Sequence, residues 1–390
     1  MTTRTVYLDA HASTPIAPEA LAALTTQLLA TGNPHSPHAA GAQAHDAIEG
    51  ARQAVAELIG AAPPEIVFTS GATEANNLAI LGLARASAKT SKRRIIVTSA
   101  IEHPSVTETV AALRAEGFAH RIAPAGADGR VDLAALADLI DEDVLLVCVM
   151  AANNVTGIIQ PIREVAALAR AAGALIHCDA AQATGRIAID VFDLDVDSLS
   201  LSAHKMYGPP GVGALYVSAA SAVRPAPVTF GGGQERGLRP GTAPAGLIAA
   251  FGAAARLVLD QRDQDANHAH SLLTRFTAAL EALQVRFLTN GSNQHRLPGS
   301  LSLSLGECDA QELVERLSTE IALSTGSACS SGQIVISPAL EAMRLSAQRA
   351  RASVRICFNR YSIEADADVA ALAIARTLRE MELAAGSIVQ

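Results

Sequence analysis

Lysine is rare in this chain, and one lysine stands in a setting that suits covalent chemistry. Among the 390 residues only Lys89, Lys92 and Lys205 are lysines. The first two lie in a polar run beside arginines, which is typical of a solvated loop. Lys205 follows the strand-like run 197–203 and precedes a turn rich in proline and glycine. A surface lysine at a strand end is the commoner case, but a desolvated lysine can attack a carbonyl to form a Schiff base, which arginine cannot do.

Other polar side chains follow further apolar runs. Asp179 ends one run, where its carboxylate can pair with a buried cationic nitrogen or, more commonly, cap a helix. The turn 71–73 offers N–H groups and a hydroxyl to an anion, or is an ordinary capped turn. His103 can act as an acid or base or stack on a ring, although a lone histidine is more often structural. Asn154 and Gln182 are neutral hydrogen-bonding groups.

Taken together, these groups are the ones that pyridoxal phosphate (PLP) requires. The lysine forms the Schiff base, and a carboxylate keeps the pyridine nitrogen protonated so that the ring acts as an electron sink. A helix N-terminus and hydroxyl groups hold the phosphate. The neighbours of Lys205 add two more groups that can hold a phosphate: the hydroxyl of Ser202 and the imidazole of His204. The sequence therefore predicts a PLP site.

The elements that must position these groups alternate between strands and helices. Short apolar runs are predicted as strands at 66–69, 95–98, 144–150, 175–178 and 198–202. Helical patterns separate most of them, which indicates βαβ units and a mainly parallel sheet covered on both faces. Ligands of such sheets bind outside the carboxyl ends of the strands, where the polar residues stand. No G-x-G-x-x-G follows the first strand, which disfavours a dinucleotide-binding dehydrogenase.

The pattern changes after about residue 262, which predicts a smaller α+β domain. A long helix is predicted at 263–284, followed by strands at 285–288, 300–305, 321–324 and 353–358. Helices are predicted at 309–317 and 365–384, and an irregular stretch at 325–337.

Composition excludes several classes of function. The formal charge is −8 and no basic block interleaves with aromatic residues, so we expect no direct nucleic-acid binding. The longest apolar stretch, 245–255, is too short to span a membrane, and the N-terminus shows no hydrophobic signal segment, so we expect a soluble, cytoplasmic protein. The five cysteines are widely spaced, and His35 and His38 lack a matching pair, so we expect neither a disulfide framework nor a metal site.

Ordered motifs over nearly the whole chain resemble those of cysteine desulfurases, within the class V branch of the fold-type I PLP enzymes. The matching segments are 7–9, 12–15, 32–34, 69–74, 102–103, 153–154, 179–182, 202–205, 231–235, 239–242 and 327–329. The resemblance implies an α/β fold with a mainly parallel seven-stranded sheet in a large domain, residues 13–260. A smaller α+β domain would comprise residues 1–12 and 261–390.

The resemblance also implies roles around the cofactor ring. Lys205 would bind PLP, and His103 would stack on the ring and move protons. Asp179 would pair with the pyridine nitrogen. Asn154 and Gln182 would form hydrogen bonds near the phenolic oxygen.

Further roles concern the phosphate and the substrate. The phosphate would be held by the strand-to-helix turn and by groups beside the lysine: Ala72, Thr73, Ser202 and His204. Thr242 would reach the phosphate of the other subunit, which implies a homodimer with composite sites. Arg355 would bind the substrate carboxylate, helped by Asn33 and Asn154.

Lys205 is common to PLP enzymes, whereas Cys329 distinguishes the expected reaction from the other reactions of this superfamily. Cys329 lies among small residues and glycine, which predicts an exposed, mobile loop at about 325–337, whereas Cys148 and Cys178 lie in apolar strands. An accessible cysteine can act as a thiolate nucleophile. In the family this thiolate attacks the sulfur of L-cysteine, so alanine leaves and a persulfide remains on the enzyme for a sulfur acceptor. The Ser-Ala-Cys context resembles the long-loop group that serves iron–sulfur scaffolds.

Four positions depart from the family pattern: Val155, Pro210, Phe230 and Asn359. None removes a proposed catalytic group, but they leave the acceptor open among an iron–sulfur scaffold, a tRNA thiolation protein and a DNA thiolation protein. Two alternatives on the same fold are a class V aminotransferase and a selenocysteine lyase, with Cys329 merely structural. A third is a weakly active scaffold that organises a partner complex.

Overall fold

A seven-stranded sheet forms the centre of the larger part of the molecule. The computed structural model describes residues 4–325 and 336–388. The strand order is β2-β8-β7-β6-β5-β3-β4, and the pairs among β7, β6, β5, β3 and β4 are parallel. β8 is antiparallel to both of its neighbours. The bounds are β2 Ile66–Thr69, β3 Ile95–Ser99, β4 Ala119–Ala123, β5 Val144–Cys148, β6 Leu175–Asp179, β7 Ser198–Ser202 and β8 Gly213–Val217. The predicted mainly parallel seven-stranded sheet is confirmed.

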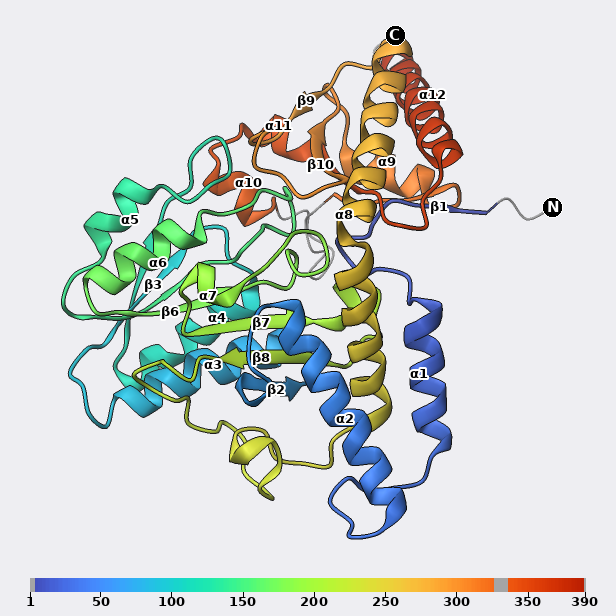
Figure 1. The fold of residues 1–390 in the computed structure, drawn as a ribbon. Helices are drawn as coiled ribbons and strands as arrows, with labels where there is room; N and C mark the ends of the chain where they lie inside the picture. The colour runs from blue at the N-terminus through green and yellow to red at the C-terminus, as the bar shows by residue number, and fades with distance from the viewer. Residues whose placement is uncertain (1–3, 326–335, 389–390) are drawn as a thin grey trace.

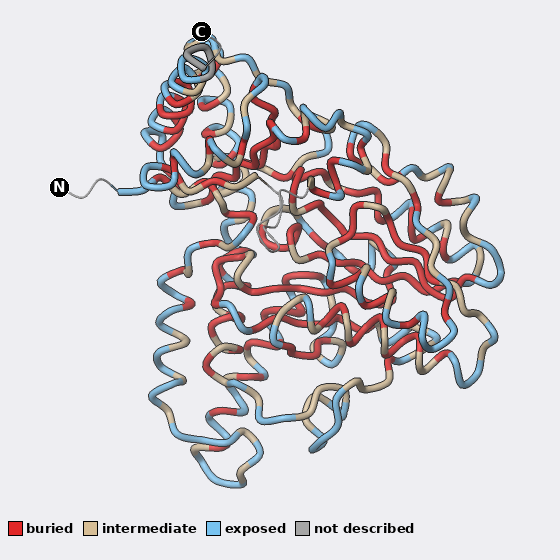
Figure 2. The backbone as a smooth tube through the Cα atoms, turned by 180° about the vertical axis from the view of Figure 1, so that it is seen from behind, coloured by how far each residue is buried: buried red, intermediate tan, exposed pale blue. Residues whose placement is uncertain are grey.

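Helices cover both faces of this sheet, because successive strand residues alternate between two apolar layers. On one face Val97 and Phe68 pack in a core with α2, α6 and the first half of α8. On the other face Ile96 and Val67 pack with α3 and α4. The helix bounds here are α1 Pro18–Leu29, α2 Ala39–Leu58, α3 Ala72–Ser87, α4 Pro104–Ala112, α5 Leu133–Leu139, α6 Ile162–Ala171 and α7 Val191–Leu194. Figure 2 shows the buried residues concentrated along the strands between these layers.

The longest helix joins this sheet to a second core. α8 runs continuously over Ala245–Ala282, so the helix predicted at 263–284 begins 18 residues earlier than expected, by the difference 263 − 245. Its first half contributes Phe251 to the core beneath the sheet, and its second half contributes Phe276 to the other core. In Figure 1 it extends from the sheet to the part of the molecule that holds both termini. The predicted domain limit at residue 260 lies inside α8 and stays a prediction.

The second core lies between α8, α9, α12 and a small antiparallel sheet of order β12-β10-β9. The N-terminal strand β1 pairs in parallel with β11, so the start of the chain joins the C-terminal part in this region. The bounds are β1 Val6–Tyr7, β9 Leu288–Thr289, β10 Ser300–Ser304, β11 Ile321–Ala322 and β12 Ser353–Cys357. The helices are α9 Ala310–Leu317, α10 Pro338–Ala342, α11 Ala347–Arg351 and α12 Glu364–Ile388.

No helix in the described part of the chain is both long and apolar enough to cross a membrane. Within the same residues, no group of three or more His, Cys, Asp or Glu side chains is arranged to hold a metal ion. His38, one of the two histidines with metal-like spacing, caps α2 by accepting a hydrogen bond from the Gly41 N–H at 3.2 Å.

Candidate active site

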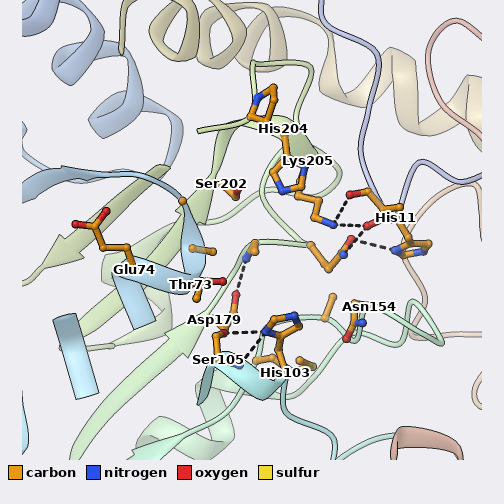
Figure 3. A pocket seen from close by; sticks show the side chains of 18 of the residues that line it. His11, Thr73, Glu74, His103, Ser105, Asn154, Asp179, Ser202, His204 and Lys205 are labelled. Carbon is orange, nitrogen blue, oxygen red and sulfur yellow. Dashed lines mark hydrogen bonds between the residues drawn. The ribbon is translucent and has the colours of Figure 1, made fainter. Parts of the chain in front are cut away.

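A cavity of about 540 Å³ opens at the carboxyl ends of the parallel strands (Figure 3). The parallel sheet brings the ends of β5, β6 and β7 to this edge, as expected for the fold. The predicted site residues that line the cavity are Ala72, Thr73, His103, Asn154, Asp179, Gln182, Ser202, His204, Lys205 and Arg355. These ten side chains come from segments far apart in the sequence, and folding places them around one space.

Lys205 projects into the cavity from the short 3₁₀ turn that follows β7 (Figure 3). Its Nζ donates hydrogen bonds to the carbonyl oxygens of His11 and Ala12, the latter at 2.8 Å. Burial lowers the pKa of this ammonium from 10.5 to about 8, and the nearby charges of Arg355 and Arg186 act in the same direction. A substantial fraction of Lys205 is therefore the neutral, nucleophilic amine near neutral pH.

Asp179 is the last residue of β6 and is nearly buried. Its Oδ1 accepts a hydrogen bond from the Ala181 N–H at 3.0 Å, and its Oδ2 accepts one from the Asn76 amide at 2.8 Å. No helix begins directly after Asp179, so Asp179 does not act as a helix cap. A buried carboxylate at the cavity wall is suited to pair with a cationic ring nitrogen.

His103 forms the N-cap of α4 and faces the cavity from the side opposite Lys205 in Figure 3. Its Nδ1 accepts a hydrogen bond from the Ser105 N–H at 3.1 Å and lies 2.8 Å from the Ser105 hydroxyl. Burial lowers the pKa of the imidazole, so the ring is neutral at pH 7. Its place allows it to stack on a planar group or to transfer protons.

The N-terminus of α3 forms an anion site at the other end of the cavity. Among the described residues no side chain caps this helix at Gly71, so its first N–H groups remain open to a ligand. Thr73 and Ser202 add hydroxyls to the lining. A Cβ on Gly213 of β8 would lie 2.6 Å from the Gly71 Cα, so only glycine permits this close approach of strand and turn.

His204 completes the anion site. Burial, together with the nearby charge of Lys205, lowers the pKa of His204 to about 4. Its Nδ1 lies 3.3 Å from the Ser13 hydroxyl. Helix N–H groups, two hydroxyls and an imidazole are the donors that a phosphate monoester requires.

Gln182 is held by a residue that the sequence did not single out. His11 is fully buried, with Nδ1 3.0 Å from the Gln182 Oε1 and Nε2 2.5 Å from the Ser300 hydroxyl. The Gln182 amide nitrogen in turn donates to the His11 carbonyl at 2.9 Å. Since an amide oxygen only accepts, His11 carries its proton on Nδ1. This pair of contacts fixes the Gln182 amide and leaves one of its N–H groups for a ligand.

Arg355 projects from β12 at the junction of the two cores. One terminal nitrogen donates to the Asp9 carboxylate at 2.6 Å, and the other donates to the Asn154 carbonyl at 2.8 Å. Its buried Nε has no hydrogen-bond partner in the described part of the protein. A guanidinium with donor capacity to spare at a cavity wall is suited to bind a carboxylate.

Two predicted residues, Asn33 and Thr242, do not line this cavity. Asn33 is exposed, and its side chain accepts a hydrogen bond from the His35 N–H. Thr242 is exposed in the segment before α8. Cys329 lies outside the described residues. The roles predicted for these residues stay predictions.

Comparison with known proteins places this geometry in a family. The family model described as "Aminotransferase class-V" matches residues 6–370. The chain belongs to this family. This class-V chain is 42% identical over 384 residues to "Cysteine desulfurase, mitochondrial" of Saccharomyces cerevisiae, with 97% of the chain and 76% of the relative covered. It is also 42% identical over 381 residues to "Cysteine desulfurase IscS" of Anaeromyxobacter sp. (strain Fw109-5), with 96% of the chain and 94% of the relative covered.

A solved structure titled "NIFS-LIKE PROTEIN" superimposes with a TM-score of 0.89 at 33% identity and covers 96% of the chain and 100% of that structure. The resemblance to the cysteine desulfurase branch and the fold class are thereby confirmed, and so is PLP, the cofactor of this family. The donors of the cavity fit the cofactor. The uncapped N-terminus of α3 suits its phosphate, Asp179 suits its ring nitrogen, and Lys205 suits its aldehyde.

Two departures from the family pattern find a structural reason. Val155 is buried against Leu340 and Met343 and so helps to anchor α10. Asn359 does not adopt a positive φ, so no glycine is required there, and its Oδ1 accepts a hydrogen bond from the Tyr361 N–H at 3.0 Å. Pro210 lines the cavity, and Phe230 is 87% exposed.

Proposed function

We propose that the protein is a PLP-dependent L-cysteine desulfurase, which converts L-cysteine to L-alanine and passes the sulfur to an acceptor. The observation that carries the proposal is the convergence of Lys205, Asp179, His103 and Arg355 on one cavity. The names of the relatives at about 42% identity support it.

Each residue contributes a distinct step around the bound cofactor. PLP, when bound, supplies an electron sink that stabilises negative charge on the substrate carbon atoms. Lys205 would hold PLP through its amine, since the low pKa keeps part of that amine neutral. Asp179 holds the proton on the ring nitrogen, and His103 moves protons to and from the substrate.

Arg355 orients the substrate through its carboxylate. The guanidinium lines the cavity beside Asn154, whose carbonyl accepts a hydrogen bond from one of its terminal nitrogens at 2.8 Å. A charge-assisted, two-pronged contact to a carboxylate fixes both position and direction. Asn33 would assist from the N-terminal part of the chain only if that loop approached the cavity of a neighbouring subunit.

Cys329 carries the sulfur. Ser324 lines the cavity, and Cys329 follows it by five residues, which span at most about 18 Å of extended chain. In the reaction the Cys329 thiolate attacks the substrate sulfur, so an S–S bond forms and the substrate C–S bond breaks. The electron pair of that bond passes to the substrate carbon, which takes up a proton and leaves as alanine. The persulfide on Cys329 is then available to an acceptor thiol.

A homodimer accounts for surfaces that the cavity does not use. Leu28 and Leu29 at the end of α1 are 70% and 82% exposed, and Leu28 lies beside Gly246 at the start of α8. Exposed Phe230 and Thr242 stand on the segment that leads into the same helix. Large exposed apolar side chains mark protein interfaces, so a second subunit would place Thr242 at its partner's phosphate site.

The remaining proposals concern the cellular setting. We propose a cytoplasmic enzyme whose acceptor is a protein thiol of an iron–sulfur scaffold, with tRNA or DNA thiolation proteins as the other acceptors. A class V aminotransferase or a selenocysteine lyase is the alternative activity. Product analysis separates these functions: alanine and sulfide from L-cysteine support the desulfurase, whereas a keto acid, or activity restricted to selenocysteine, supports the alternative.

The decisive experiment is sulfur transfer by a Cys329→Ala variant. With L-cysteine and a radiolabelled sulfur, the wild type should hold label on the protein and release alanine. Cys329→Ala should keep the absorption of bound PLP but lose the protein-bound label. Cys308→Ala is a matched control, because Cys308 is a free, half-buried cysteine that does not line the cavity. An undiminished transfer rate in Cys329→Ala would refute the mechanism.

A further inference from the structure

A fully buried asparagine connects several elements behind the cavity. Asn76 lies in the second turn of α3 with no exposed surface. Its amide nitrogen donates to the Asp179 carboxylate and to the Ser105 hydroxyl, each at 2.8 Å. Its amide oxygen accepts from the Ser200 hydroxyl at 2.5 Å and lies 2.9 Å from the His177 Nε2. Two donors and two acceptor sites are thus all used.

The neighbours leave only one orientation for this amide. The Asp179 carboxylate can only accept, so the nitrogen of Asn76 must face it. The oxygen then faces His177, whose Nε2 must carry the proton. Its Nδ1 lies 2.9 Å from the Ser198 hydroxyl, which donates to it. Asn76 therefore ties α3 to β6, β7 and the start of α4 through a fully satisfied network.

This orientation determines where the proton of His103 lies. The Ser105 hydroxyl accepts from Asn76, so its own hydrogen is free to donate to the His103 Nδ1. The Ser105 backbone N–H donates to the same nitrogen. A ring nitrogen that accepts two hydrogen bonds carries no proton. In the neutral ring the proton is thus on Nε2.

We propose that Asn76 is a positioning residue for the reaction: it donates to the Asp179 carboxylate and, through Ser105, keeps the ring proton of His103 on Nε2. The proposal rests on the proposed function, since it takes the roles of His103 and Asp179 from there. It adds that the proton transfers of His103 take place at Nε2. It also adds that one amide couples His103, the acid–base group, to Asp179, the carboxylate that would pair with the ring nitrogen of PLP.

The loss of Asn76 should affect both groups at once. Without the amide, the Ala181 N–H is the one donor that Asp179 keeps among residues 4–325 and 336–388, and the Ser105 hydroxyl can turn to accept from His103. The His103 tautomer with its proton on Nδ1 then becomes similar in energy to the tautomer protonated on Nε2. The Nδ1 tautomer cannot deliver a proton from Nε2. A group that acts only on proton transfer changes kcat rather than the binding of substrate.

The test compares Asn76→Ala with Asn290→Ala in the PLP-loaded enzyme. Asn290 is a matched control: it is also fully buried, donates to Ser302 and Ser353, and accepts from Ser304 and Arg349, but it lies in the second core. For Asn76→Ala we expect kcat with L-cysteine to fall about tenfold or more, while KM changes less than about threefold. Asn290→Ala should leave kcat within about twofold of wild type.

Nitrogen NMR of histidine-labelled protein gives a readout that needs no turnover. The wild-type His103 should show a protonated Nε2 and an unprotonated Nδ1, and Asn76→Ala should show both tautomers in exchange. If Asn76→Ala does not fold, Ser105→Ala removes the hydroxyl alone and should shift the tautomers in the same direction. A wild-type proton on Nδ1 would overturn the proposal, as would a variant with unchanged tautomer and kcat. An inactive wild type with the expected tautomer would count against the desulfurase activity alone.

Discussion

The acidity of Lys205 can be measured directly, because the chain holds only three lysines. Protein labelled with ¹³C at the lysine Cε and freed of PLP should give three signals, and Lys205→Arg identifies the one that matters. Burial and two neighbouring arginines lower the pKa of Lys205 to about 8. About a quarter of the amine is then neutral at pH 7.5, against roughly one part in a thousand for an ordinary lysine. A titration from pH 6 to 11 measures this midpoint.

The ion pair beside the lysine provides two perturbations of opposite sign. Arg355 lowers the pKa of Lys205, whereas Asp9 raises it, and the two side chains are joined by a contact of 2.6 Å. Arg355→Met should therefore move the Lys205 midpoint upward, and Asp9→Asn should move it downward. The two variants alter the same contact, so a general loosening of the site would move both midpoints in one direction.

Two results would refute this reasoning. A wild-type midpoint near 10.5 would mean that Lys205 is solvated and that the cavity does not depress its pKa. A shift of the same sign in Arg355→Met and Asp9→Asn would mean that charge is not the cause. Either result would refute the inference that the site keeps part of the Lys205 amine neutral before PLP binds, whatever the activity of the enzyme.

Three further predictions concern stability and cofactor binding. Glu235→Gln, which breaks the buried ion pair with Arg52, should cost about 3–5 kcal/mol in the free energy of unfolding, whereas Glu116→Gln in an exposed pair should cost less than about 1 kcal/mol. Burial raises the pKa of Glu102 to about 8, so the folded state binds this proton more tightly than the unfolded state does. The free energy of unfolding of the wild type therefore falls as pH rises from about 4.5 to 8. Glu102→Gln, which has no proton to lose, should gain stability relative to wild type across that window, as measured by thermal unfolding. Gly213→Ala would press on the turn before α3 and should raise the Kd for PLP about tenfold or more by fluorescence titration; an unchanged Kd would contradict the close approach.

The strands of the central sheet could be predicted where they are buried on both faces. β5 has all five residues buried, and such strands read as continuous apolar runs. β4 was missed because it lies at the edge and carries partly exposed His120 and Arg121. β8 was missed because it returns antiparallel to β7 after a turn, without the helix that marks the other connections.

The first half of α8 could not be recognised from hydrophobic periodicity. It packs against α1, α2 and the sheet, so apolar residues and small glycines occur around its whole circumference. Gly252, for example, approaches the backbone of Ala51 so closely that a Cβ would lie 2.5 Å from the Ala51 Cα. A helix buried all round has no polar face, and the sequence shows only an apolar stretch.

The cavity was predicted largely from residues at strand ends, because a parallel sheet brings those ends together. His11 and Asn76 were missed because neither stands at the end of a strand of the central sheet. His11 lies in a loop punctuated by proline, and its contact with Gln182 joins positions 171 residues apart. Asn76 had a signal: a polar amide stands between Ala75 and Leu78 on the buried face of α3. A polar residue at such a position requires partners, and these can be found only in the folded structure.

The continuity of α8 has a consequence for how the protein unfolds. A helix of 38 residues extends for about 57 Å, and its hydrogen bonds run without a break from one core into the other. Losing the sheet core would expose Phe251 and fray the helix toward Phe276, so neither core keeps its support when the other melts. We expect amide hydrogen exchange to slow together along the whole of α8, as in a single cooperative unit. The two cores would then share one unfolding transition although their sheets are separate.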